Sequence, residues 1–246
     1  MTTSNLDVRV ITEISDIADS PRGGSHTSYL VFGDGTPNTG LLVKQLPTYE
    51  LARELVCALV ANAVGLPVAR PYIVDLNATG LPGQRWAFGS EYVRTAQKIA
   101  QDEAILERLN RWPLLPLAVA FDELIGNEDR TLKNILYVPK SAFLLIDHGA
   151  ALPDDLQPQQ LLRSNLLADR VAGDPSGRSS PKQRVLAAAA TLQFDGAQIE
   201  VAAKGPAWGG GLMANECLRL LHDRRQYLQD LIASRFDPFQ RRIQWP

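Results

Sequence analysis

The sequence is poor in cysteine and histidine and has no long apolar run. Its 246 residues include two cysteines, Cys57 and Cys217, and three histidines. Two cysteines cannot build a disulfide framework or a cysteine-rich zinc site, so we expect both to be reduced, buried thiols. Three histidines are too few to suggest a histidine-based metal centre. No apolar run approaches the ~20 residues of a membrane span, and Met1–Asn5 does not resemble the start of a signal peptide, so we expect a cytoplasmic protein.

A basic excess is also missing. The chain has 25 Lys and Arg residues against 27 Asp and Glu residues, which gives a formal net charge of −2. General nucleic-acid binders usually carry a basic excess, so we expect no nucleic-acid partner. Hydrophobic residues make up 45% of the chain and charged residues 21%, which is an ordinary globular composition. A chain of this length can bury most of its surface, either as one large domain or as two small lobes.

Residues 1–93 show strand patterns around one strong helix pattern. The helix is predicted over Tyr49–Val64, where apolar residues recur every fourth position, and Gly65 ends it. Short apolar, alternating or β-branched segments predict strands at residues 6–11, 27–32, 41–44, 70–75 and 84–93. We expect the first three strands to be antiparallel, with a hairpin turn at Gly33–Gly35.

After Arg94 the pattern becomes mostly helical. Helices are predicted at residues 102–108, 114–125, 156–167, 181–192 and 213–235, and short strands at 135–138 and 143–146. Residues 173–180 form the most loop-like segment. We therefore predict an α+β fold with two lobes, a β-rich one over residues 1–93 and a mostly helical one over residues 94–246.

The segments Gly126–Asn134 and Leu144–Gly149 carry the strongest chemical signal. The first reads GNEDRTLKN, with Asp129 and Asn134 five positions apart, and the second reads LLIDHG, with Asp147 closing a predicted strand. This spacing is typical of a kinase catalytic loop, in which the first Asp accepts the substrate hydroxyl proton while the Asn and the second Asp bind metal. Such oxygen ligands suit Mg²⁺ held together with substrate phosphates.

An upstream lysine lies where a kinase would need one. Lys44 ends the predicted strand at residues 41–44, a position from which a lysine reaches nucleotide phosphates in kinases. Glu54 is a better partner for it than Glu50, since Glu54 lies a full turn inside the predicted helix. The alternative for Lys44 is an ordinary solvated lysine, and we expect the neighbouring Arg53 to lie at the surface.

Two further segments fit a nucleotide site less specifically. Gly23, Gly24 and Ser25 lie between predicted strands, where small residues let backbone N–H groups approach phosphate oxygens, although a plain turn has the same composition. At the junction of the two lobes, Glu91 and Val93 occupy the position of a kinase hinge, whose backbone would contact the adenine edge.

Arg130 and His148, beside the catalytic positions, have more than one interpretation. Arg130 would either contact a phosphate or anchor the loop through carbonyls or a carboxylate. His148 is expected to pack or to form hydrogen bonds near Asp147 rather than to transfer protons.

These motifs resemble those of the HipA-like kinases, a group that is also similar to phosphoinositide 3/4-kinases. The resemblance covers most of residues 20–150 and includes Ile125–Arg130, Asn134, Leu145–Gly149, Lys44, Arg53–Leu55 and Gly65–Val68. It implies a bilobal kinase fold with Asp129 as the catalytic aspartate, Asn134 and Asp147 on the metal, and Lys44 on the ATP phosphates.

The chain departs from that family in two respects. Thr131 stands where many members have His, so the internal hydrogen bonding of the loop must differ. The chain also lacks the length for the extra N-terminal subdomain of the longer HipA toxins.

The leading functional hypothesis is an ATP- and Mg²⁺-dependent phosphotransferase. Its acceptor would be a Ser or Thr hydroxyl of a protein, including its own Ser25, Thr27 or Ser28. Three alternatives remain open: a lipid or small-molecule kinase, a nucleotide-binding regulatory module with weak turnover, and an enzyme that transfers AMP instead of phosphate.

Overall fold

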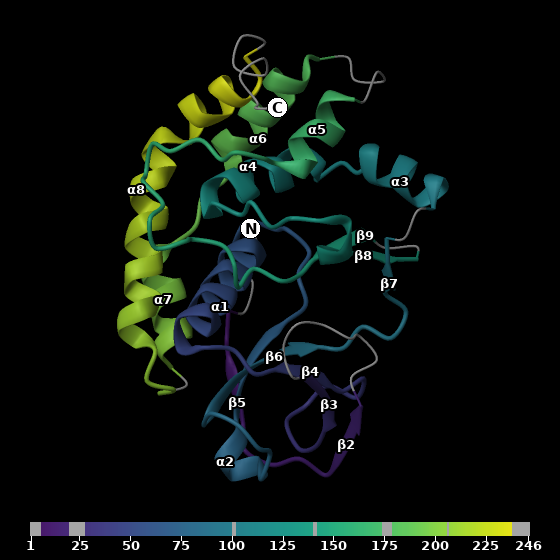
Figure 1. Cartoon of the computed structure of the whole chain (residues 1–246), viewed down its shortest axis with the longest axis vertical. Coiled ribbons are helices and arrows are strands. Elements are labelled where there is room, and N and C mark those ends of the chain that lie inside the picture. Colours follow the sequence, from purple (N-terminus) through teal and green to yellow (C-terminus); the bar gives the residue numbers. More distant parts are fainter. Residues whose placement is uncertain are drawn as a thin grey trace.

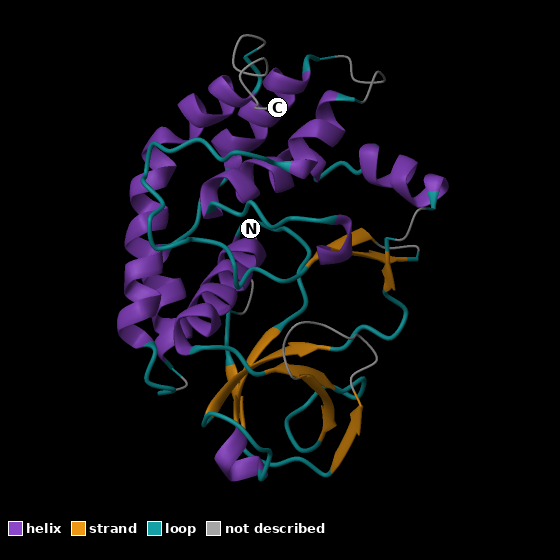
Figure 2. Cartoon of the chain, viewed as in Figure 1, coloured by secondary structure: helices purple, strands orange, loops and turns teal. Residues whose placement is uncertain are grey.

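The computed structural model describes residues 6–19, 28–99, 102–139, 142–173, 179–205 and 207–237. Figure 2 shows most strands gathered at one end of the molecule and most helices at the other. The chain is thus divided into a β-rich part and a helical part, as the two sequence patterns predict.

A six-stranded sheet forms the β-rich part, in the order β1-β5-β6-β4-β3-β2. Its strands are β1 (Arg9–Ile11), β2 (Asp16–Asp19), β3 (Ser28–Phe32), β4 (Leu41–Lys44), β5 (Pro71–Asp75) and β6 (Trp86–Glu91). The predicted hairpin joins β3 to β4, and the amide of Thr36 donates to the carbonyl of Gly33 at 3.2 Å in its turn. A short helix, α2 (Leu76–Thr79), follows β5.

The expectation that the first strand is antiparallel is wrong. β1 runs parallel to β5, with Arg9 opposite Tyr72. Because three further strands of this sheet and a helix come between β1 and β5 in the chain, no tight hairpin fixes their relative direction.

Helix α1 (Thr48–Ala63) lies between the sheet and the helical part, as Figure 1 shows. It packs against β5 and β6 and also against the C-terminal helices α7 (Gly196–Lys204) and α8 (Gly211–Arg235). Its central residues are buried all round, since Ala52, Leu55 and Val56 are each 0% exposed. α1 therefore joins the sheet to the C-terminal helices through one shared core.

The helical part contains a second, smaller sheet. Its order is β7-β8-β9, with strands β7 (Gln97–Lys98), β8 (Ile135–Val138) and β9 (Ala142–Leu145). The remaining helices are α3 (Glu103–Asn110), α4 (Leu115–Ile125), the 3-10 turn η1 (Leu132–Asn134), α5 (Leu166–Ala172) and α6 (Pro181–Thr191). The strands and helices predicted at 135–138, 114–125, 181–192 and 213–235 are confirmed to within two residues at each end.

The predicted helix over residues 156–167 is wrong for most of its length. Only its last two residues belong to a helix, α5, which begins at Leu166. Leu156 and Leu162 are buried, so their spacing reflects packing under an irregular segment. The carbonyls of Gln157, Pro158 and Gln160 accept hydrogen bonds from the guanidinium of Arg224 instead of from helix amides.

Cys57 and Cys217 are both free and buried, which confirms the expectation of reduced thiols. Among the described residues, none of the helices combines the length and apolarity that crossing a membrane requires.

Candidate active site

The loop that presents Asp129 begins where α4 ends. Gly126 caps the helix with φ +65°, and a Cβ added there would lie 2.3 Å from Cδ2 of Leu156. The next residue, Asn127, is fully buried, and its Oδ1 accepts the backbone amide of Asp129 at 3.2 Å. This tight turn leaves the side chain of Asp129 exposed.

Arg130 anchors the loop from inside. Its guanidinium donates to both carboxylate oxygens of Asp122 on α4, with bonds of 2.9–3.2 Å. It also donates to the carbonyls of Asn134 at 3.1 Å and Ile146 at 2.7 Å. Arg130 is 4% exposed. Of the two interpretations of Arg130, the structure therefore shows the anchor, since the guanidinium is occupied by these partners.

Asn134 lies close to Ile146, the residue before Asp147. The amide of Ile146 donates to the carbonyl of Asn134 at 3.0 Å, and the Nδ2 of Asn134 donates to the carbonyl of Asp129 at 3.1 Å. Asp147 itself has φ +64°, a left-handed conformation that costs a residue with a side chain about 1–2 kcal/mol. The network that fixes Ile146 thus holds Asp147 in a backbone conformation it would not favour alone.

Lys44 reaches Asp147 from the sheet. Its Nζ donates to Oδ1 of Asp147 at 3.0 Å, although the two residues are 103 positions apart. The side chain of Lys44 is only 17% exposed, so the alternative of an ordinary solvated lysine does not hold.

Glu54 lies beside this pair and is buried. Its Oε2 accepts the backbone amide of His148 at 2.5 Å, and Nδ1 of His148 lies 3.8 Å from Oε1. Burial alone would raise the pKa of Glu54, but the adjacent His148 and the charge of Lys44 outweigh burial and lower the pKa to about 2. Glu54 is therefore a carboxylate on α1 that contacts the residue after Asp147 and is attracted to Lys44.

The ring of His148 packs as expected. It is 1% exposed and meets Phe121 edge to face, with ring centroids 5.8 Å apart. Neither ring nitrogen has a hydrogen-bond partner among the described residues. Its backbone amide donates to Glu54 and its Nδ1 lies 3.8 Å from Oε1 of Glu54, so the ring packs in the core beside this carboxylate.

Two cavities meet at Asp147. One has mostly apolar walls and is lined by Leu42, Lys44, Glu54, Ala58, Val68, Ala69, Phe88, Ser90, Glu91, Tyr92, Val93, Leu136 and Leu144–His148. The other is polar and is lined by Leu46, Tyr49, Glu50, Arg53, Asp129, Asp147, Gly149, Ala150, Pro153, Asp154 and Asp155. We call them the apolar cleft and the acidic pocket. Among the described residues, Asp147 is the one lining residue that both have in common.

The hinge positions lie at the rim of the apolar cleft, whereas the glycine-rich positions are not placed. Glu91 and Val93 both line the cleft. The amide of Glu91 donates to the carbonyl of Arg70 at 3.0 Å, which leaves its carbonyl as the group able to contact a base. The predicted phosphate-loop residues Gly23, Gly24 and Ser25 fall outside the described residues.

Several residues that shape the site were not identified from the sequence. Arg53, expected at the surface, is 11% exposed in its side chain; it pairs with Asp154 and lies 5.1 Å above the ring of Tyr49. Asp122, the partner of Arg130, was also missed. A usable signal existed, because Asp122 and Glu123 interrupt an otherwise apolar helix, and buried carboxylates are nearly always paired.

Comparison with known proteins bears on the family and the fold of the chain. Residues 14–184 match the family model described as HipA-like kinase. No curated protein matches the sequence. Among solved structures, the fold is similar to that of the proinflammatory kinase CtkA of Helicobacter pylori, with a TM-score of 0.56 and 13% sequence identity over 91% of this chain and 97% of that chain. At this identity the likeness shows the fold alone, which is the predicted bilobal, kinase-like α+β fold. Because the family model covers more than half of its length, the chain belongs to the HipA-like kinase family.

Proposed function

We propose that the protein transfers the γ-phosphoryl group of ATP to a Ser or Thr hydroxyl of a protein acceptor. One observation carries the proposal: Asp147 lies at the boundary of two cavities, one containing Lys44 and the other containing Asp129. Phosphoryl transfer needs a nucleotide and an acceptor on opposite sides of a metal-bound phosphate, and two adjoining cavities supply such an arrangement.

The apolar cleft is the proposed nucleotide site. Leu42, Val68 and Phe88 offer apolar walls for a flat base, and the backbone at Glu91 and Val93 offers polar contacts at the rim. Lys44 lies at the Asp147 end, where its ammonium would bind phosphate oxygens. In this proposal residues 1–93 supply most of the nucleotide contacts, and residues 94–246 supply the catalytic loop.

Asn134 and Asp147 are the proposed ligands of Mg²⁺. Carboxylate and amide oxygens are suitable donors for this ion, which retains water and shares substrate phosphates. No group of three or more His, Cys, Asp or Glu residues in the described part of the chain forms a metal site by itself. That finding fits a metal completed by nucleotide phosphates. A bound Mg²⁺ would neutralise charge on the transferred phosphoryl group.

Asp129 is the proposed base. Its carboxylate has no hydrogen-bond or ion-pair partner among the described residues, and its backbone is held by Asn127 and Asn134. It would accept the proton of the acceptor hydroxyl as the hydroxyl oxygen attacks phosphorus.

Transfer to the chain itself is a narrower form of the proposal. Ser28 lies opposite Lys44 in the antiparallel β3–β4 ladder, so its side chain is on the same face of the sheet as that of Lys44. Ser25 and Thr27 fall outside the described residues.

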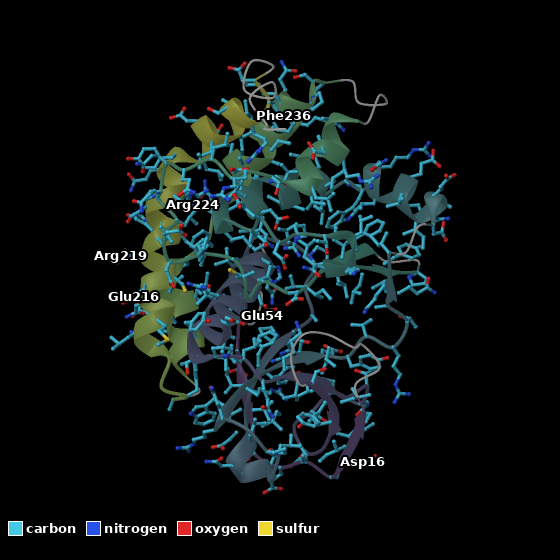
Figure 3. The ribbon with its side chains drawn as sticks, viewed as in Figure 1. Asp16, Glu54, Glu216, Arg219, Arg224 and Phe236 are labelled. Carbon is cyan, nitrogen blue, oxygen red and sulfur yellow. The ribbon has the colours of Figure 1, made fainter. Side chains whose placement is uncertain are left out.

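A labelled-phosphate assay tests the proposal. With γ-labelled ATP and Mg²⁺, we expect Asp129→Asn and Asp147→Asn to lower the rate of transfer to protein by about 10²–10⁴-fold. The control is Asp16→Asn, which changes an exposed carboxylate on β2 that Figure 3 shows far from Glu54. The intact mass of the product distinguishes added phosphate from added AMP. Unchanged transfer by both site variants, or an AMP adduct, would contradict the proposal.

A further inference from the structure

The acidic pocket lies where an acceptor would approach Asp129. Its walls come from the start of α1, from Asp129 in the catalytic loop, and from residues 149–155. In the part of the chain that the structure describes, Asp147 alone lines both this pocket and the apolar cleft. A molecule in this pocket would therefore reach Asp129 without occupying the nucleotide site.

The pocket has a strong excess of negative charge. Glu50, Asp129, Asp147, Asp154 and Asp155 line it, and the only basic side chain among its described lining residues belongs to Arg53. Asp129 and Asp147 serve the chemistry in the proposed function. The remaining three acids still outnumber the single arginine.

Arg53 does little to offset these acids. Its guanidinium is already paired with Asp154 and stacked on the ring of Tyr49, and its side chain is 11% exposed. The carboxylate of Asp155, in contrast, is exposed and has no hydrogen-bond or ion-pair partner among the described residues. The Asp155 charge is therefore available to an incoming molecule, whereas the Arg53 charge is largely satisfied within the protein.

Tyr49 adds an aromatic surface that suits a basic side chain. It is 46% exposed, it lines the same pocket as Glu50, and its ring already stacks with one cation, the guanidinium of Arg53. An aromatic face beside carboxylates favours the long aliphatic stem and cationic head of Arg or Lys.

We infer that the acidic pocket binds the acceptor, and that this acceptor is a protein segment with Arg or Lys close to the phosphorylated hydroxyl. The inference rests on the proposed function, because Asp129 marks the pocket as the acceptor side. A phosphoinositide headgroup carries phosphates, which the acids of this pocket would repel. ATP phosphates in the neighbouring cleft add further negative charge, so nucleotide binding would strengthen the preference for a cation.

A binding measurement tests the inference independently of catalysis. Three fluorescent peptides of equal length would be compared by anisotropy, each with one serine flanked by arginines, alanines or glutamates. We expect the arginine peptide to bind the full-length protein most tightly, with affinity falling as salt rises. Exposed carboxylates are worth up to about 1 kcal/mol each, so Asp155→Asn should weaken its binding about threefold. Asp154→Asn/Asp155→Asn should weaken it about tenfold, because the double change also releases the charge of Arg53.

Matched controls separate this inference from the proposed function. Asp16→Asn makes the same charge change on β2, at a residue that does not line the pocket, and should leave peptide binding unchanged. Phosphatidylcholine vesicles with and without phosphoinositide would be tested for binding and as phosphate acceptors in the same buffer. Equal binding of the three peptides, no effect of the double variant, or preferential binding or phosphorylation of phosphoinositide vesicles would overturn the inference. Tight, Asp155-dependent binding without any phosphate transfer would support the preference of the pocket for a basic segment. It would refute the proposed catalytic function.

Discussion

Arg130 holds three segments of the site together with one buried side chain. Asp122 in α4, the carbonyl of Asn134 and the carbonyl of Ile146 all accept hydrogen bonds from it. Removing one partner of a buried ion pair leaves an unpaired charge, which costs about 3–5 kcal/mol. We expect Arg130→Met to lower the free energy of unfolding by that amount in urea denaturation.

An ion pair whose arginine is exposed provides the control. Arg85 also pairs with an aspartate, Asp75, but its side chain is 61% exposed, and Asp75 keeps two backbone amide donors. Arg85→Met should therefore cost less than about 1 kcal/mol. Equal losses for the two variants would show that burial does not decide the strength of the Arg130 anchor.

Glu54 predicts a dependence of stability on pH. Its pKa falls from the usual 4.5 to about 2 in the folded protein, so its ionised form stabilises the fold above pH 4.5 and that contribution is lost as the pH falls toward 2. Such a pKa shift corresponds to a contribution of up to about 3 kcal/mol to the free energy of unfolding. In urea titrations, the stability difference between wild type and Glu54→Gln should be largest near neutral pH and should shrink below pH 4.5. A difference that stays constant down to pH 3 would contradict this assignment.

The sequence proposed that Lys44, Asn134 and Asp147 lie together, and the structure brings Lys44 to Asp147, but the sequence did not indicate the shape of their surroundings. Asp129, Asn134 and Asp147 are close along the chain, so one local pattern could propose them together, and Lys44 was proposed from its place at the end of a predicted strand. Arg53 and Asp154 are 101 positions apart and meet only through folding, and no local pattern reports such a pair.

At the scale of elements, the end of α4 sets the position of the loop that carries Asp129. Gly126 and Gly80 both cap helices in the left-handed conformation, with φ +65° and +72°. An added methyl group would meet Leu156 at Gly126, whereas nothing lies within 4 Å at Gly80. We expect Gly80→Ala to cost about 1 kcal/mol and Gly126→Ala about 2–4 kcal/mol, measured by thermal unfolding. Equal costs would show that Leu156 moves aside freely.

Elements with local signals were predicted well, and elements held by distant contacts were not. The 4-residue strand β4 follows from a short apolar run, and the helix α1 follows from helical spacing. The short strands β2 (Asp16–Asp19) and β7 (Gln97–Lys98) were missed, because they are defined mainly by pairing with neighbours. The false helix at residues 156–167 arose because buried leucines in an irregular segment imitate helical spacing.

At the scale of the whole molecule, the C-terminal helix α8 supports the end of α4, where the loop that carries Asp129 begins. Figure 3 shows Arg224 on α8. Its fully buried guanidinium donates to the carbonyls of Glu123 and Leu124 at the end of α4, at 2.7 and 3.0 Å. A cation at this end complements the helix dipole. Because Arg224 also holds residues 157–160, α8 fixes both α4 and the segment that follows the acidic pocket.

The two parts of the chain meet at the site through α1. α1 packs on the sheet and on α8, and its Glu54 contacts His148, next to Asp147. Lys44 from the sheet contacts Asp147 directly. The relative position of the two parts is therefore coupled to the geometry around Asp147, the residue that the apolar cleft and the acidic pocket share.

The central claim is that Asp147 separates a nucleotide site from an acceptor site. A crystal structure with Mg²⁺ and a non-hydrolysable ATP analogue tests it most directly. We predict the base in the apolar cleft beside Glu91 and Val93, the phosphates at Lys44, the metal on Asn134 and Asp147, and the terminal phosphate directed toward Asp129 and the acidic pocket. A nucleotide bound outside the apolar cleft, or a metal held without Asn134 and Asp147, would contradict the claim.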